Sequence, residues 1–97
     1  MHKLSSITPA FVTTITEQPE HGICYVSEEY TVAVFLCPCG CGLKTVIPFK
    51  PAAGKQKEHY WQYWRQDDKV TFEPSMLNNF CPNKAHWHIR NNQIDWC

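Results

Sequence analysis

Hydrophobic and polar residues alternate along several stretches of the chain with the two-residue period that is typical of β-strands. The strongest stretch covers residues 30–37, which are apolar on both faces and therefore favour a central strand. Residues 7–16 are rich in β-branched side chains, and shorter apolar stretches cover residues 23–26 and 43–49. The first half of the chain therefore predicts four strands, with a turn at residues 18–22 after the first.

Turn residues predict two further hairpins in the second half of the chain. The first hairpin turns at Gln66-Asp67-Asp68. The second turns at Asn91-Asn92, because asparagine tolerates the positive φ of a tight turn. The strands that flank these two turns are predicted at residues 60–65, 69–73, 85–90 and 93–96.

Helix signals are weak in this sequence. Pro74 and Ser75 predict one helical turn with Ser75 as its cap, and residues 51–57 predict a loop. We therefore expect a mainly β fold, with small α+β content at most, built from two or three antiparallel hairpins. The 97 residues predict a single domain, 1–97. A domain this short buries only roughly 60–65% of its unfolded surface, so a metal or disulfide staple would add stability.

Composition narrows the classes of function. The nine basic and nine acidic residues balance, which argues against a general nucleic-acid binder, although Lys55 and Lys57 form a local basic patch. No apolar run approaches the roughly 20 residues that span a membrane, and the N-terminus lacks the apolar core of a signal peptide. These features predict a cytoplasmic protein without a membrane partner. Disulfides rarely persist in that compartment, so clustered cysteines there favour metal binding.

Three cysteines, Cys37, Cys39 and Cys41, alternate with proline and glycine in one short loop. Thiolates suit zinc, which takes four such ligands in a tetrahedron, and glycine lets the chain turn so that the sulfurs converge. The C-x-C-x-C spacing differs from the common C-x2-C knuckle. Cys39 and Cys41 are the preferred turn pair, and Cys37 is a third ligand or a structural thiol. The alternative is three buried cysteines without a metal.

The remaining ligands are expected far along the chain. Cys81 and His86 have a four-residue gap that fits zinc sites, so a single zinc ion would clip the central hairpin to the C-terminal one. His88 would point the same way as His86 on a strand and is an alternative ligand or a neighbour of the site. Iron remains an alternative to zinc. Cys24 is expected to be a buried thiol and Cys97 a free one.

No catalytic motif is recognisable, and no catalytic residue is assigned. The sequence lacks a glycine-rich phosphate loop, an H-E-x-x-H motif and a deaminase pattern. The four tryptophans are expected mainly in the core. Trp61 and Trp64, with Lys55 and Lys57, form a candidate binding face for a protein or a nucleic acid.

The motifs together resemble a family of small bacterial and phage proteins of unknown function that accompany prokaryotic ubiquitin-like conjugation operons. The resemblance covers roughly residues 20–97. The sequence departs from the family pattern at three places. Phe35 stands where histidine is frequent, four residues separate Cys81 from His86, and His88 stands where an aromatic is frequent. The elements that carry the resemblance are Gly22–Ser27, Tyr30–Gly42 with its C-x-C-G-C-G motif, Trp64, Val70–Ser75, Cys81, His86, Ile89 and Trp96.

The resemblance implies a protein partner in ubiquitin-like modification. We therefore expect a non-enzymatic module with a structural zinc, which binds a protein in a prokaryotic ubiquitin-like modification or phage-defence system. One alternative is a nucleic-acid-binding zinc module. A further alternative is a zinc-dependent hydrolase, which would need an open coordination position on the metal.

Overall fold

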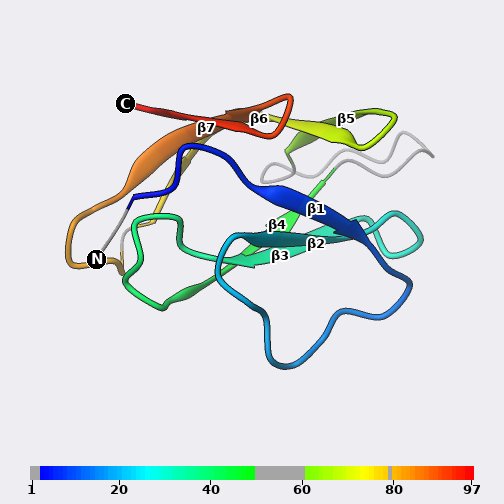
Figure 1. The fold of residues 1–97 in the computed structure, drawn as a ribbon, viewed down its shortest axis with the longest axis horizontal. Helices are drawn as coiled ribbons and strands as arrows, with labels where there is room; N and C mark the ends of the chain where they lie inside the picture. The colour runs from blue at the N-terminus through cyan, green and yellow to red at the C-terminus, as the bar shows by residue number, and fades with distance from the viewer. Residues whose placement is uncertain (1–2, 50–60, 79) are drawn as a thin grey trace.

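The computed structural model describes residues 3–49, 61–78 and 80–97, apart from the side chain of Pro74, and these residues form two four-stranded sheets. Figure 1 shows the sheets as two layers, with β1–β4 in one and β5–β8 in the other. The prediction of a mainly β fold with antiparallel hairpins is confirmed. The strands are β1 (Thr8–Phe11), β2 (Ile23–Ser27), β3 (Val32–Leu36), β4 (Lys44–Pro48), β5 (Gln62–Gln66), β6 (Lys69–Leu77), β7 (His86–Arg90) and β8 (Gln93–Trp96).

The first sheet has the order β1-β2-β3-β4. Strands β2, β3 and β4 form antiparallel pairs, and the buried residues Ala33, Val34 and Phe35 make β3 a central strand, as its apolar sequence predicted. Strand β1 is shorter than the stretch predicted for it and pairs parallel to β2. Parallel pairing needs a long return connection, and residues 12–22 supply it.

The second sheet is an antiparallel meander in the order β5-β6-β7-β8. Its last hairpin turns at Asn91 and Asn92, whose φ angles are 49° and 68°. Positive φ at both central residues is the geometry of the turn that suits a two-residue hairpin loop, and asparagine adopts it at little cost. Arg90 pairs with Gln93, so the predicted hairpin is confirmed.

The predicted helical turn at Pro74 and Ser75 is wrong, because β6 continues through this point to Leu77. The pairing of β6 with β7 is interrupted between Phe72 and Met76. Proline has no N–H to donate to a ladder and is found in sheets at edges and bulges. The interruption allows Pro74 within the strand, while Met76 still reaches the core.

The core lies between the two sheets. Phe35 of β3 and Trp87 of β7 are fully buried, and their rings meet edge to face with centroids 6.2 Å apart. The N-terminal segment also joins the layers. The backbone N–H of Ile94, in β8 of the second sheet, donates to the carbonyl of Ser5 (2.9 Å). The N-terminal segment that contains Ser5 then continues into β1 of the first sheet.

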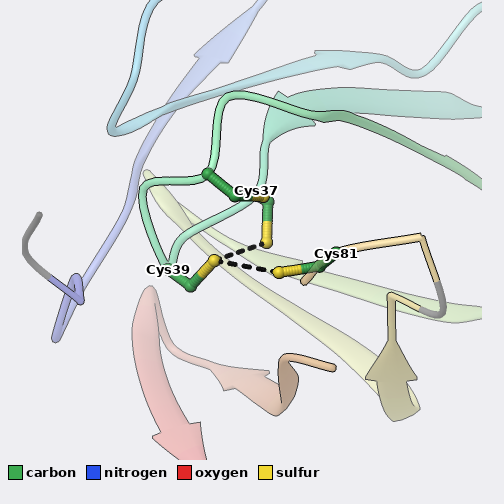
Figure 2. Close-up of side chains that lie close together, drawn as sticks. Cys37, Cys39 and Cys81 are labelled. Carbon is green, nitrogen blue, oxygen red and sulfur yellow. Dashed lines mark hydrogen bonds between the residues drawn. The ribbon is translucent and has the colours of Figure 1, made fainter. Parts of the chain in front are cut away.

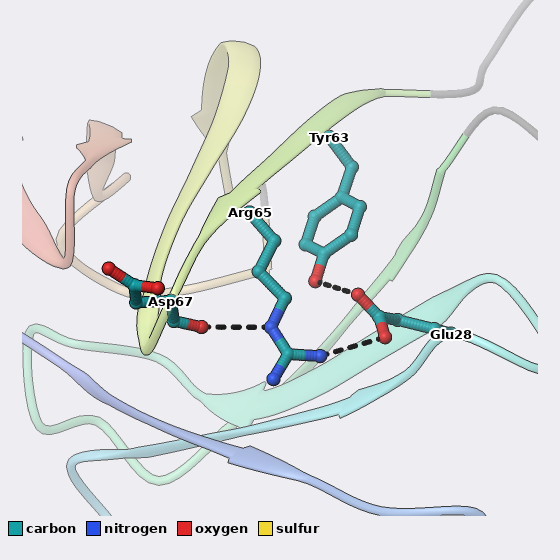
Figure 3. A network of polar contacts seen from close by, with 4 residues as sticks. All are labelled: Glu28, Tyr63, Arg65 and Asp67. Atoms are coloured by element: carbon teal, nitrogen blue, oxygen red, sulfur yellow. Dashed lines mark hydrogen bonds and ion pairs between the residues drawn. The ribbon is translucent and has the colours of Figure 1, made fainter.

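A polar network links the layers at the end opposite the cysteine loop. Glu28, just after β2, accepts hydrogen bonds from the Tyr63 hydroxyl (2.7 Å) and the Arg65 guanidinium (2.9 Å) of β5 (Figure 3). Arg65 also donates to the carbonyl of Asp67 (2.9 Å) and stacks on the Phe11 ring. In the described part of the chain, no helix is long and apolar enough to cross a membrane.

Candidate functional site

The cysteine loop closes the β3–β4 hairpin. The Cys37 N–H donates to the Leu43 carbonyl (2.7 Å), and the Gly40 N–H donates to the Cys37 carbonyl (3.1 Å). Gly40 and Gly42 adopt φ values of 92° and 87°, which side chains with a Cβ rarely adopt. The two glycines therefore let the chain turn sharply at two points within one hairpin loop, which brings the cysteines of the loop together.

Cys81 comes from the connection between β6 and β7. Its N–H donates to the Asn78 carbonyl (3.2 Å), and its carbonyl accepts from the Lys84 N–H (2.9 Å). The Asn78 N–H in turn donates to the Ala85 carbonyl (2.9 Å), which closes this connection just beyond the last paired residues of the two strands. The connection is therefore a compact loop that directs the Cys81 sulfur toward the first sheet.

The ligand atoms of Cys37, Cys39, Cys41 and Cys81 lie within 4.8 Å of one another and could hold one metal ion. Sulfur-to-sulfur distances are 3.4 Å from Cys37 to Cys39 and 3.2 Å from Cys39 to Cys81. Figure 2 shows these three sulfurs pointing toward a common centre. A zinc ion with Zn–S bonds of about 2.3 Å separates its sulfurs by about 3.8 Å, so small side-chain rotations would fit the ion.

The thiol chemistry of this cluster also favours a cation. Burial raises the pKa of Cys37 to about 12, so its thiolate is disfavoured unless a positive charge is near. At Cys81 burial also acts upward, but hydrogen bonds from the Ala85 backbone and from the Cys39 thiol outweigh it and lower the pKa to about 6. One thiolate among several thiols is the starting point from which a metal displaces the remaining protons.

His86 lies outside the four-cysteine group, although the sequence analysis placed it among the ligands. Its ring nitrogen Nε2 lies 2.8 Å from the hydroxyl oxygen of Ser75 on β6. His86 opens β7, and its side chain is on the face opposite the fully buried Trp87. Strand alternation therefore turns the imidazole away from the core, whereas Cys41 supplies the sulfur that completes the group of four.

Ser75 was predicted only as a helix cap and not as a site residue. The interruption in β6 explains why the serine meets the histidine, since bulges re-aim side chains and recur beside active sites. Two signals were present in the sequence. Pro74 inside a strand pattern indicates an irregular ladder, and the Val70–Ser75 element belonged to the family resemblance.

The other predicted residues are spread over the molecule. His88 shares a face of β7 with His86, and it also lies outside the four-cysteine group. Trp64 is 51% exposed, whereas Trp61 is half-buried against the core. Lys55 and Lys57 lie outside the described residues, so the candidate binding face is described only in its tryptophans.

A cleft of about 250 Å³ separates β4 from the start of the β6–β7 connection. Met76 and Leu77, the two residues after Ser75, form part of its wall. Three buried polar atoms on residues that line it lack hydrogen-bond partners among the described residues: Thr45 Oγ1, Trp61 Nε1 and Trp87 Nε1. The lining of the cleft is mainly apolar.

Comparison with known proteins identifies a family. No curated protein and no solved structure matches the chain with significance. The model of the BubE family, described as a bacterial ubiquitination-like system serine protease, matches residues 11–97. Since the match spans nearly the whole sequence, including the cysteine loop, Ser75 and His86, the chain belongs to the BubE family of bacterial ubiquitination-like systems.

Proposed function

We propose that this chain is a serine peptidase with Ser75 as the nucleophile and His86 as the general base. The observation that carries the proposal is the 2.8 Å contact between Ser75 Oγ and His86 Nε2. A nucleophile and a base within hydrogen-bond reach are the central pair of serine hydrolases. The family description names a serine protease, and the contact supplies a serine and a histidine suited to that chemistry.

The chemistry follows from the tautomer of His86. With the proton on Nδ1, the Nε2 lone pair accepts the hydrogen bond from the Ser75 hydroxyl. Nε2 then takes the serine proton as Oγ attacks a carbonyl carbon, and it later returns that proton to the leaving amine. Among the described residues, only Ser75 is hydrogen-bonded to the His86 ring, so the proposed unit is a dyad.

The substrate is proposed to be a protein component of the bacterial ubiquitination-like system. Leu77 is 52% exposed and follows Ser75 by two residues on β6, so it could contact an apolar side chain of that substrate beside the cleft. The exposed Trp64 offers further contact area on the same sheet. We place the reaction in the cytoplasm, where such a protein substrate would be met.

The metal in this proposal is one zinc ion held by Cys37, Cys39, Cys41 and Cys81. A zinc ion that uses all four sulfurs has no open position for water, so its role is structural and the alternative of a zinc hydrolase is disfavoured. Three sulfurs come from the β3–β4 hairpin and one from the β6–β7 connection. The ion would therefore tie the two sheets together close to the strands that carry the dyad.

The dyad is tested with a fluorophosphonate, which modifies serines activated by a neighbouring base. Wild-type protein should be modified once, at Ser75, as read by intact mass and peptide mapping. Ser75→Ala should abolish the modification, and His86→Ala should slow it by at least about 1,000-fold. Ser6→Ala and His21→Ala are the matched controls, because both side chains are exposed and neither lies on the strands that carry the dyad.

Folded, metal-loaded wild-type protein that is not modified at Ser75 would contradict the peptidase. The non-enzymatic module that binds a protein partner would then be the remaining function. Binding to a labelled oligonucleotide that weakens steeply with salt would instead favour the nucleic-acid-binding alternative.

A further inference from the structure

Ser75 lies on β6 opposite the part of β7 that carries two histidines, His86 and His88. Leu77 pairs with His86 and Met76 pairs with Trp87, so one more step along the ladder would pair Ser75 with His88. The ladder is interrupted at this step and resumes where Phe72 pairs with Ile89. Residues 73–75 therefore stand opposite the single residue His88, with His86 diagonal to Ser75.

The two histidines point to the same side of the sheet. Trp87 and Ile89 are fully buried, whereas His86 and His88 are half-buried on the opposite face. This alternation is the normal geometry of a strand. A carbonyl group attacked by Ser75 would therefore approach a surface that offers both imidazoles.

The buried nitrogen of His88 fixes which of its atoms is available. His88 Nδ1 is buried and has no hydrogen-bond partner among the described residues. A neutral imidazole carries one donor and one acceptor nitrogen. A buried N–H without an acceptor is rarer and more costly than an unused lone pair, so the unpartnered Nδ1 favours the tautomer with its proton on Nε2. The donor then lies at the outer end of the ring.

Two acidic residues lie on the strands that flank His88. Asp95 of β8 is the cross-strand partner of His88, but its carboxylate accepts from Arg90 at 3.3 Å. Glu73, on the β6 side, is exposed to solvent. Among residues 3–49, 61–78 and 80–97, neither carboxylate makes a hydrogen bond to the His88 ring.

We propose that His88 is a catalytic residue that donates its Nε2–H to the oxygen on which negative charge develops. The proposal rests on the peptidase function proposed above. Ser75 Oγ bonds to the carbonyl carbon, the C=O π electrons move to the oxygen, and the serine proton passes to His86. His88 stabilises the oxyanion without giving up its proton. The C=O bond then re-forms, the C–N bond breaks, and His86 returns the proton to the leaving amine.

The test is the second-order rate of Ser75 modification by a fluorophosphonate, whose phosphoryl oxygen would take the place of the oxyanion. His88→Leu removes the donor at similar size, and we expect a loss of about 100-fold or more. His88→Gln retains an N–H near the Nε2 position and should recover at least about tenfold over the leucine variant. His21→Leu, in an exposed turn, is the control and should react like wild type. Near-ultraviolet circular dichroism of the tryptophans establishes that each variant is folded.

The outcomes separate the two proposals. A folded His88→Leu variant that reacts within about threefold of wild type overturns the role of His88 and leaves the Ser75–His86 dyad intact. Equal losses in the leucine and glutamine variants also overturn it, because the donor would then not be what matters. A wild-type protein that is not modified at Ser75 removes the peptidase and this inference together.

Discussion

Cys24 shows what complete burial does to a single thiol. The residue lies in β2 with no exposed surface, and this burial raises the pKa of its thiol to about 12 from an ordinary value of 9.0. It lies outside the four-cysteine group. Its expected role, a small apolar side chain in the core, agrees with this placement.

The raised pKa of Cys24 predicts a loss of stability at alkaline pH. Below pH 9 the thiol is protonated in both states, so its stabilising contribution is fully present. Between pH 9 and 12 the unfolded chain releases the proton and the folded chain retains it. The free energy of unfolding should therefore fall by up to about 1.4 kcal/mol per pH unit through this one group.

Urea unfolding between pH 8 and 11 measures this slope. We expect Cys24→Ala to be less stable than wild type at pH 8 and to lose stability less steeply as the pH rises. Cys97→Ala is the control, because Cys97 is exposed. Identical slopes for wild type and Cys24→Ala would show that Cys24 ionises equally in both states.

At the scale of elements, the β7–β8 turn shows how one residue type specifies a hairpin. Asn92 has a φ of 68°, and its side-chain oxygen accepts the Val70 N–H at 2.8 Å. The residue thus provides both the backbone conformation of the turn and a bond to the neighbouring strand β6. These two contributions can be separated by substitution.

Asn92→Ala should lower the free energy of unfolding by roughly 2 kcal/mol, since it loses the side-chain hydrogen bonds to Val70 and Asp68 and strains the backbone. Asn92→Gly loses only the two side-chain hydrogen bonds and should cost about 1 kcal/mol. Asn91→Gly is the control, because glycine fits the positive φ there and should leave stability unchanged or slightly higher. Urea midpoints measure all three. Equal losses for alanine and glycine at position 92 would show that backbone strain contributes little.

Unlike the β7–β8 turn, the interruption in the β6–β7 pairing is not specified by the local preference of one residue type. Pro74 requires that a ladder hydrogen bond be absent, but Met76 must still reach the core beside Trp87. Both requirements are met because β6 has three residues, 73–75, where β7 has the single residue His88. The position of Ser75 is a consequence of this compromise.

At the scale of the whole molecule, the four cysteines connect the two sheets. Their sulfurs come from the β3–β4 loop and from the β6–β7 connection, which joins the strands of Ser75 and His86. Metal binding should therefore stabilise both layers and hold the dyad in register. Structural zinc contributes on the order of 10 kcal/mol in small domains.

Metal removal tests this coupling. We expect elemental mass spectrometry to find about one zinc per chain in the wild type and in Cys97→Ser, and none in Cys81→Ser. A strong chelator should lower the melting temperature of the wild type and also slow fluorophosphonate modification of Ser75. Well-folded, metal-free wild type with an unchanged melting temperature would contradict a structural metal.

The sequence by itself determined the features that depend on neighbouring residues. Strand alternation, the Asn91-Asn92 turn and the reversal of the cysteine loop all follow from local backbone preferences, and each was predicted at its place in the chain. The sequence also identified Cys81 as a distant member of the cysteine group. These features need few contacts from the rest of the fold.

Only the tertiary structure decided that His86 lies outside the sulfur cluster and that it meets Ser75 instead. Both results depend on the register between β6 and β7, because a slip of one residue moves every side chain to the other face of a sheet. That register is set by the packing of Met76 and Trp87 in the core. The pattern of residues along one strand does not specify this register, because the register depends on contacts between strands.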